Sequence, residues 1–272
     1  MFKNRSTDEK VGIYIILVMI LIVLTVFLLY VFGILGKEKP SANIIVDNSI
    51  MFKYSKKKWE EVDSENYSDY NWNKYIVYEQ GKKKGKYSVF NNDSKFYVFL
   101  ESSSSRTPIN VVGDSIYIGG KINTQFFPFE REDVSSSDLK YIRKVLDSYN
   151  ISRSDQNKYT YRYKIIYDFD GDNENEEMFI VSNLFSEDED VNNSFSVIFV
   201  RDNNNTKTIY KNVYGKNHNL TGCYAYLFGI IKVDKTKNYQ LITKCSHYSV
   251  MPSEYGLYQY DNNNYSLLLY SK

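Results

Sequence analysis

The sequence predicts a mainly β protein that carries one N-terminal transmembrane helix. Two observations support this fold class. Residues 11–36 form an uncharged stretch in which 22 of 26 residues are apolar. From residue 74 onward, short runs rich in β-branched and aromatic residues recur between clusters of Gly, Asn, Asp and Ser. That second pattern is typical of antiparallel strands joined by turns.

The apolar stretch, residues 11–36, is long enough for a membrane span. At 1.5 Å per residue, a helix of this length extends about 39 Å, whereas a hydrocarbon core is roughly 30 Å thick. Tyr14 and Tyr30 lie near its ends, where aromatic rings favour the headgroup region. A cleaved signal peptide is the alternative, but its apolar region would be only about 7 to 15 residues long. We therefore expect a retained single-pass anchor in the lipid bilayer, preceded by a cytoplasmic tail, residues 1–10.

Flanking charges say little about the orientation of this helix. Three basic residues precede it, and Lys37 and Lys39 follow it closely. The positive-inside rule therefore gives only a weak preference for which end of the helix faces the cytoplasm. The C-terminal remainder is large, β-rich and contains a loop that resembles a metal site. Because the ion for such a site would be found outside the cell, we expect this part of the chain to lie outside. We expect a bacterial cell-membrane protein with an extracytoplasmic C-terminal domain and a juxtamembrane linker over residues 37–50.

Composition narrows the chemistry of the remainder. The chain has 34 Lys and Arg against 33 Asp and Glu, for a formal net charge of +1, and this balance gives no reason to expect nucleic acid as a partner. Two cysteines and two histidines cannot supply a cysteine-rich zinc site. No nucleophile elbow, phosphate loop or HExxH motif is present. We therefore expect no catalytic residues, with His218 and His247 in structural or surface roles.

Residues 51–151 are expected to form a β-rich domain that ends in a helix. Five runs predict an antiparallel meander: Lys74–Glu79, Lys86–Phe90, Lys95–Glu101, Ser115–Ile118 and Ile122–Phe127. After the cap candidates Ser135–Ser137, apolar residues recur at helical spacing: Leu139, Ile142, Val145, Leu146 and Tyr149. This single stripe predicts one amphipathic helix, and the polar stretch 152–158 is the best domain boundary.

Residues 158–272 are expected to form a second β domain. Its predicted strands are Tyr159–Tyr167, Met178–Asn183, Phe195–Arg201, Thr206–Lys211, Cys223–Val233, Tyr239–Cys245, Tyr255–Tyr260 and Tyr265–Tyr270. Cys223 and Cys245 lie on strands that flank one turn, so they could form a disulfide outside the cell. Their spacing about the centre of the turn is not symmetric, which leaves the pairing open.

The most specific motif is the acidic loop Asp168–Glu176, between two predicted strands. It places carboxylates at relative positions 1, 3, 5 and 9 and a backbone carbonyl at position 7, which suits a hard cation such as Ca²⁺. Gly171 permits a sharp turn, and Asn173 tolerates the left-handed conformation. The alternative is a polar hairpin tip without metal. The candidate calcium ligands are Asp168, Asp170, Asp172, Glu174 and Glu176.

This loop resembles the calcium-binding hairpin loops of the FG-GAP and VCBS repeats, the blade units of integrin-like β-propellers. Those families have D-x-D-G-D-G-x-x-E/D before an apolar strand, and this chain has YDFDGDNENEEMFIVSN, with Asn173 at the second Gly and Glu177 as an extra acid. A second stretch, residues 229–243, follows the same pattern, with Lys232, Asp234, Thr236 and Gln240 at the places of the carboxylates. The resemblance covers about 110 C-terminal residues and implies an FG-GAP-like β domain with one structural calcium ion and one degenerate repeat.

These features predict a cell-surface binding module without identifying its partner, for which an envelope protein and a wall polymer are the candidates. Two lysine clusters, within residues 53–58 and 82–86, suit contact with anionic wall polymers or the membrane surface, but solvated hairpin tips and protected edge strands are the simpler interpretation. A cell-envelope hydrolase is one rival, and it would need paired carboxylates in a cleft. An accessory subunit of a membrane complex is the other.

Overall fold

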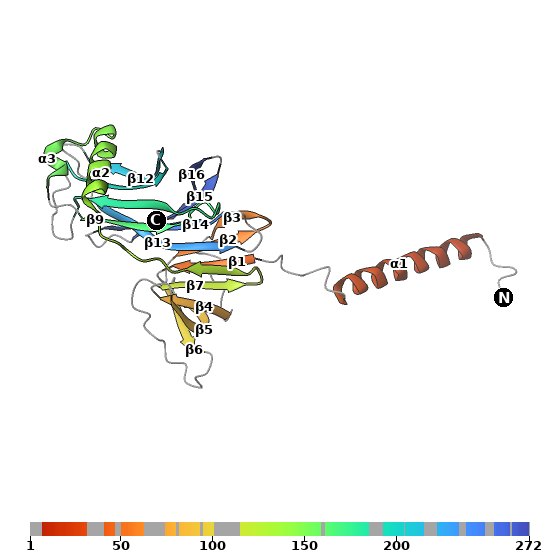
Figure 1. Cartoon of the computed structure of the whole chain (residues 1–272). Helices are drawn as coiled ribbons and strands as arrows, with labels where there is room; N and C mark the ends of the chain where they lie inside the picture. Colours follow the sequence, from red (N-terminus) through yellow and green to blue (C-terminus); the bar gives the residue numbers. More distant parts are fainter. Residues whose placement is uncertain are drawn as a thin grey trace. The chain divides into compact units, whose positions relative to one another are not determined.

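The computed structural model describes residues 7–31, 41–46, 50–62, 74–79, 82–92, 95–100, 115–158, 161–184, 193–203, 205–214, 222–233, 238–247, 253–261 and 263–271 (Figure 1). The chain divides into two compact units, Met1–Pro40 and Ser41–Lys272. Within the described ranges, the first unit contains one helix, and every strand belongs to the second.

The first unit consists of helix α1, Thr7–Val31. The helix expected over residues 11–36 is therefore present as far as residue 31, and residues 32–36 lie outside the described residues. Apart from Thr25, its side chains between Tyr14 and Leu28 are large, hydrophobic and exposed. A search of the described residues for a helix with the length and apolarity of a membrane span finds none.

The second unit contains three antiparallel sheets, which confirms the mainly β class. The seven-stranded sheet has the order β3-β2-β1-β7-β4-β5-β6, formed by β1 (Ser41–Val46), β2 (Ile50–Ser55), β3 (Lys58–Glu61), β4 (Lys74–Glu79), β5 (Lys82–Asn92), β6 (Lys95–Leu100) and β7 (Ser115–Gly120). The four-stranded sheet has the order β12-β11-β10-β9, formed by β9 (Tyr161–Tyr167), β10 (Glu176–Ser182), β11 (Phe195–Asp202) and β12 (Asn205–Val213). The five-stranded sheet has the order β16-β15-β14-β13-β8, formed by β8 (Thr124–Phe127), β13 (Cys223–Val233), β14 (Gln240–His247), β15 (Glu254–Asp261) and β16 (Asn264–Ser271).

The five-stranded sheet is the central layer, because two separate hydrophobic cores lie against it. One core joins it to the four-stranded sheet and includes Ile165, Ile180, Leu227 and Leu241. The other joins it to the seven-stranded sheet and includes Ile44, Ile116, Phe228, Ile231 and Ile242. A sheet that is buried on both faces needs apolar residues at successive positions. β13 accordingly has a long, mostly apolar sequence, CYAYLFGIIKV, and the first six residues of β14 are buried.

Helix α2 (Ser136–Ser148) covers the remaining face of the four-stranded sheet and confirms the predicted amphipathic helix. Its apolar stripe packs on β10 and β11 through Ile142, Val145 and Leu146, against Phe179 and Phe199 among others. Ser135 is the N-cap, and a capping box pairs it with Asp138. A short helix that the sequence did not predict, α3 (Arg153–Gln156), follows.

Each strand predicted from the sequence is present, with ends shifted by a few residues, but the segment 41–50 differs from expectation. Residues expected to be a linker form β1, which pairs with β2 on one side and β7 on the other. Residues 42–46 of β1, Ala-Asn-Ile-Ile-Val, are buried, because four of the five are apolar and the strand lies between β2 and β7 inside the sheet. Strands β2 and β3 form a hairpin that was likewise not predicted.

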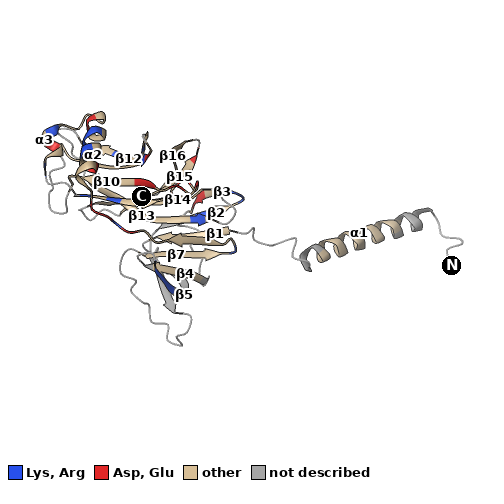
Figure 2. Ribbon diagram, in the orientation of Figure 1, with Lys and Arg blue, Asp and Glu red and all other residues tan. Residues whose placement is uncertain are grey.

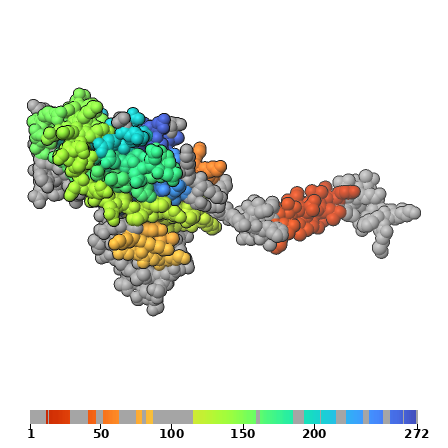
Figure 3. Space-filling model, in the orientation of Figure 1, coloured from red at the N-terminus to blue at the C-terminus, as the bar shows by residue number. Residues whose placement is uncertain are grey.

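The boundary expected at residues 152–158 is crossed by strand pairing. β8, from the N-terminal half, pairs with β13 and adds the fifth strand to the C-terminal sheet. On the surface, the orange β2–β3 hairpin lies beside the blue C-terminal strands (Figure 3), in agreement with contacts between β3 and β16. Both halves of residues 41–272 thus contribute to the same layers.

An ion cluster attaches the start of α2 to the four-stranded sheet. The carboxylate of Asp138 is buried and accepts hydrogen bonds from Ser135 Oγ at 2.8 Å and Arg201 Nη2 at 2.8 Å, and Lys164 Nζ lies 3.3 Å away. Glu177 pairs with the same two cations. Figure 2 shows basic residues in blue and acidic residues in red on α2. Burial alone would raise the pKa of Asp138, but the hydrogen bonds from these partners lower it to about 2.

Asp138→Asn is expected to lower the free energy of unfolding by about 3 kcal/mol at pH 7, because two cations then lose a buried carboxylate partner. Since the pKa of Asp138 is lowered in the folded state, its contribution is fully present above pH 4 and is lost as the pH falls toward 2. Urea unfolding of both proteins from pH 7 to pH 2 measures this. Asp133→Asn, at an exposed position just before the helix, is the control, and an equal loss in both variants would contradict the assignment.

Candidate metal centre

The acidic loop joins β9 to β10 at the edge of the core between the four- and five-stranded sheets. Tyr167 and Glu176 are the last paired residues of the two strands, so residues 168–175 form the connection. Phe169 is fully buried in that core, and its N–H donates to Glu176 Oε2 at 2.7 Å. The loop is therefore anchored inward at its second residue and at its last.

The structure brings four of the predicted ligands together. One carboxylate oxygen from each of Asp168, Asp170, Asp172 and Glu176 lies within 4.8 Å of the others. Two ligand oxygens on opposite sides of a calcium ion are about 4.6 to 5.2 Å apart, since each Ca–O distance is about 2.3 to 2.6 Å. The donor set, four carboxylates of which only Glu176 is buried, therefore fits a hard cation of this size.

Backbone hydrogen bonds hold the loop in this shape. Asp168 Oδ1 accepts from the N–H groups of Gly171 at 2.7 Å and Asp172 at 3.1 Å, and its Oδ2 accepts from Asn173 at 3.1 Å. Gly171 has φ 81° and Asn173 has φ 73°, which confirms the turn residues predicted from the sequence. The conformation that gathers the side chains is thus built by the loop itself.

Glu174 lies outside the group of converging carboxylates. Its side chain is exposed, and its N–H donates to Asp172 Oδ1 at 2.8 Å. The sequence motif assigns it a role through its backbone carbonyl at position 7, and that role stays a prediction.

The electrostatics of the loop are those of crowded, partly buried acids. Burial, opposed by the hydrogen bond from Phe169 and reinforced by the neighbouring aspartates, raises the pKa of Glu176 to about 7. Burial and the charge of Asp172 also raise the pKa of Asp170, with Lys207 opposing them. A cation at this place would reverse these shifts, because it stabilises the ionised carboxylates.

Two side chains that are distant from the acidic loop in the sequence, Tyr265 and Lys207, lie near it in the structure. Tyr265 on β16 is buried, and its pKa is raised by burial and then by the charges of Glu176 and Asp170. Lys207 on β12 forms an ion pair with Asp202 and donates to the hydroxyl of Tyr260. No local motif could have revealed either residue, because only the packing of β12 and β16 brings them near the loop.

The hairpins β9–β10 and β13–β14 can be compared position by position, using the alignment of the two sequence stretches given above. The sequence alignment places Ile231 and Gln240 opposite Tyr167 and Glu176, and both pairs are the last Cα partners of their hairpins. Gln240 is fully buried, and its Nε2 donates to Asn238 O at 2.9 Å and to Gln259 Oε1 at 3.2 Å. A neutral amide thus occupies the place that Glu176 has in the acidic loop, while residues 234–237 lie outside the described residues.

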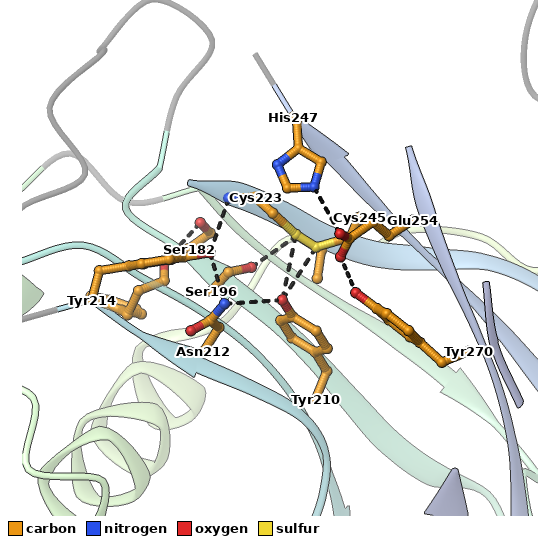
Figure 4. Close-up of a disulfide and its surroundings, with 12 residues drawn as sticks. Ser182, Ser196, Tyr210, Asn212, Tyr214, Cys223, Cys245, His247, Glu254 and Tyr270 are labelled. Carbon is orange, nitrogen blue, oxygen red and sulfur yellow. Dashed lines mark hydrogen bonds and ion pairs between the residues drawn. A yellow bond between two sulfur atoms is a disulfide. The ribbon is translucent and has the colours of Figure 1, made fainter. Parts of the chain in front are cut away.

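A disulfide joins Cys223 on β13 to Cys245 on β14, with a Cα–Cα distance of 5.4 Å (Figure 4). Cys245 lies opposite Ala225 in the ladder, and Cys223 opposite His247, so the bridge is diagonal. This explains the asymmetric spacing seen in the sequence. The hydroxyl of Tyr210 lies 3.4 Å from Cys223 Sγ and 3.2 Å from Cys245 Sγ, so the buried bridge also contacts the four-stranded sheet.

His247 lies beside this bridge, with Nε2 3.5 Å from Glu254 Oε1. Glu254 also accepts a hydrogen bond from the hydroxyl of Tyr270 (Figure 4). These contacts link β14, β15 and β16 side by side. His218 and Trp72 lie outside the described residues.

Comparisons of the chain with protein-family models, with curated proteins and with solved structures find no match.

The raised pKa of Glu176 predicts a stability slope in metal-free solution. The folded carboxyl keeps its proton up to about pH 7, whereas the ordinary value is 4.5, so the free energy of unfolding falls as the pH rises through this window. Glu176→Gln is expected to lack this slope, with a relative gain of up to about 3 kcal/mol at pH 8. Urea unfolding in EDTA from pH 4 to 8 measures the difference. Glu174→Gln, at an exposed position in the same loop, should keep the wild-type slope; parallel curves for wild type and Glu176→Gln would contradict the prediction.

Removal of the disulfide is expected to destabilise the protein. The bridge closes a segment with a sequence separation of 22, for which chain entropy gives about 3 kcal/mol. The double variant Cys223→Ala, Cys245→Ala should unfold at lower urea concentration by this amount, and reductant should lower the wild type to the same midpoint. Reductant should not change the variant, since these are the only two cysteines. Thiol labelling checks that the bridge is completely reduced. If the urea midpoint of the fully reduced wild type is unchanged, the predicted stabilisation by the disulfide is refuted.

Proposed function

We propose that this protein is a membrane-anchored, extracytoplasmic interaction module in which the acidic loop binds calcium as a structural ion. The observation that supports the calcium site is the convergence of Asp168, Asp170, Asp172 and Glu176 within 4.8 Å. Such a set of oxygens from one hairpin suits Ca²⁺, with an affinity of about 0.1 to 1 mM for an exterior module.

The proposed location follows from three features. Residues 11–36 are uncharged and mostly apolar. Apart from Thr25, the side chains of α1 between Tyr14 and Leu28 are exposed hydrophobics that favour lipid. The disulfide Cys223–Cys245 suits an oxidising compartment. Calcium at millimolar concentration is expected outside the cell, where a site of weak affinity would fill.

Calcium would connect the layers of the domain. Phe169 anchors the loop in the core between two sheets, and Tyr265 of the neighbouring sheet lies close enough to experience the charge of Glu176. An ion that neutralises the carboxylates would remove repulsion at this edge. Two successive meanders, β9–β12 and β13–β16, have the same strand order, which supports the proposed relation to FG-GAP and VCBS repeats.

A hydrolase is less well supported by the acidic residues. Glycoside hydrolysis uses two carboxyl groups about 5 to 9.5 Å apart that face each other across the scissile bond. The four converging carboxylates instead belong to one hairpin and lie within 4.8 Å, where a cation would occupy the space of a substrate.

Calcium is expected to raise the melting temperature of the full chain. At 10 mM, or about 10 to 100 times the expected Kd, the gain is about 1.4 to 2.7 kcal/mol, equivalent to roughly 3 to 10 °C. Differential scanning calorimetry in detergent micelles, with and without calcium, measures the shift. Glu176→Gln and Asp170→Asn should lose most of it.

Glu174→Gln is the matched control, because the proposed role of Glu174 uses only its backbone carbonyl. It should retain the calcium shift. The calcium site is refuted if the wild type shows no shift at 10 mM, or if Glu176→Gln responds as strongly as the wild type.

A further inference from the structure

A cavity of about 490 Å³ lies between the β2–β3 hairpin and the C-terminal strands of the five-stranded sheet. β3 contacts β16 there, and all of the lining residues belong to the unit 41–272. The cavity is lined by Tyr54, Lys57, Lys58, Trp59, Asn238, Gln259 and Leu268. It is separate from the acidic loop, which shares none of these residues.

Aromatic rings form one wall of this cavity. Tyr54 and Trp59 are cross-strand partners on β2 and β3, with ring centroids 5.1 Å apart at an angle of 57°. Trp59 is partly buried and packs against the core between the central and seven-stranded sheets. The indole is thus fixed by the fold while it lines the cavity, as in a platform for the apolar face of a ligand ring.

Two lysines bring positive charge to the same cavity. Lys57 and Lys58 are exposed, and among the described residues neither forms an ion pair with a carboxylate. Side-chain ammonium groups in this position offer donors to a ligand carboxylate or phosphate.

The turn that presents these lysines is strained. Lys56 and Lys57 have φ values of 52° and 64°, in a two-residue connection between Ser55 and Lys58. Such hairpin turns favour Asn-Gly, because both residues have positive φ, which costs about 1 to 2 kcal/mol for an ordinary residue. Strain at Lys57, which also lines the cavity, points to a role for its side chain.

Amide side chains supply the remaining polar groups. Asn238 Nδ2 donates to the backbone carbonyl of Tyr260, and Gln259 Oε1 accepts from Gln240 at 3.2 Å. These bonds orient both amides at the cavity wall. Amides of this kind can both donate to and accept from the hydroxyl groups of a sugar.

We propose that this cavity binds one unit of an acidic saccharide. The apolar face of the sugar ring would stack on Trp59, its hydroxyls would contact Asn238 and Gln259, and its carboxylate or phosphate would pair with Lys57 and Lys58. The inference rests on the proposed role as an envelope interaction module, but it requires neither the calcium site nor the anchor.

Tryptophan fluorescence of the full chain tests this site directly. The chain has two tryptophans, so Trp72→Phe leaves Trp59 as the only reporter. The protein is held in lauryldimethylamine oxide micelles, whose headgroup contains no sugar, and titrated with a hyaluronan tetrasaccharide and with tetragalacturonate. At least one should change the emission saturably, and chitotetraose, which is neutral, should bind at least ten-fold more weakly.

Variants separate charge from fold. Lys57→Gln with Lys58→Gln should lower the affinity at least ten-fold without changing the melting temperature. Lys83→Gln, at an exposed position on β5, should have no effect on binding. Lys56→Asn with Lys57→Gly, which suits the turn, should raise the melting temperature yet weaken binding.

Four outcomes would overturn the proposal. These are an absence of binding to both acidic probes, equal affinity for chitotetraose, equal affinity for inorganic phosphate alone, and unchanged affinity in the double lysine variant. The calcium shift of the same preparation is measured in parallel, so failure of the saccharide site is distinguished from failure of the calcium site.

Discussion

Burial of the five-stranded sheet on both faces is the constraint on which the structure of residues 41–272 depends. Its strands contribute to one core with the four-stranded sheet and to another with the seven-stranded sheet. At Gly229 a β-bulge shifts the register, and a Cβ there would meet side-chain atoms of Ile116 at 2.6 Å and Phe126 at 2.7 Å. Ile116 of the seven-stranded sheet and Phe126 of the neighbouring strand β8 approach so closely here that β13 needs a residue without a side chain.

Both candidate sites lie at margins of this central layer. The acidic loop closes the core on the side of the four-stranded sheet, where Phe169 enters it. The aromatic cavity lies on the side of the seven-stranded sheet, where Trp59 packs against the other core. In each case an aromatic residue, fully buried at Phe169 and partly buried at Trp59, packs against a core and thereby positions the charged groups next to it.

Local patterns in the sequence account for most of the strands and for α2, because alternation, apolar runs and caps act over a few residues. The acidic loop was predictable for the same reason, since Asp168 to Glu176 are contiguous. Layer order was not predictable, because β8 pairs with β13 more than a hundred residues away, and nothing near either strand encodes that choice. β1 was missed because its short run follows a predicted membrane segment and resembles a tether. The cavity was missed because Trp59 meets Gln259 and Leu268 only through packing of β3 on β16.

The pair Glu176 and Gln240 shows how one hairpin can serve two purposes. Both residues begin the second strand of a hairpin, both are buried, and both hydrogen-bond within their own turn. The position therefore requires a polar side chain that satisfies nearby backbone groups, and an amide does this without charge. A carboxylate at this position is instead destabilised when ionised: burial and repulsion from three aspartates raise the pKa of Glu176 to about 7. Packing alone gives no reason for this unfavourable charge. A cation that balances this charge would give the carboxylate a physical reason, whereas in residues 232–240 only Asp234 is acidic among the four aligned positions.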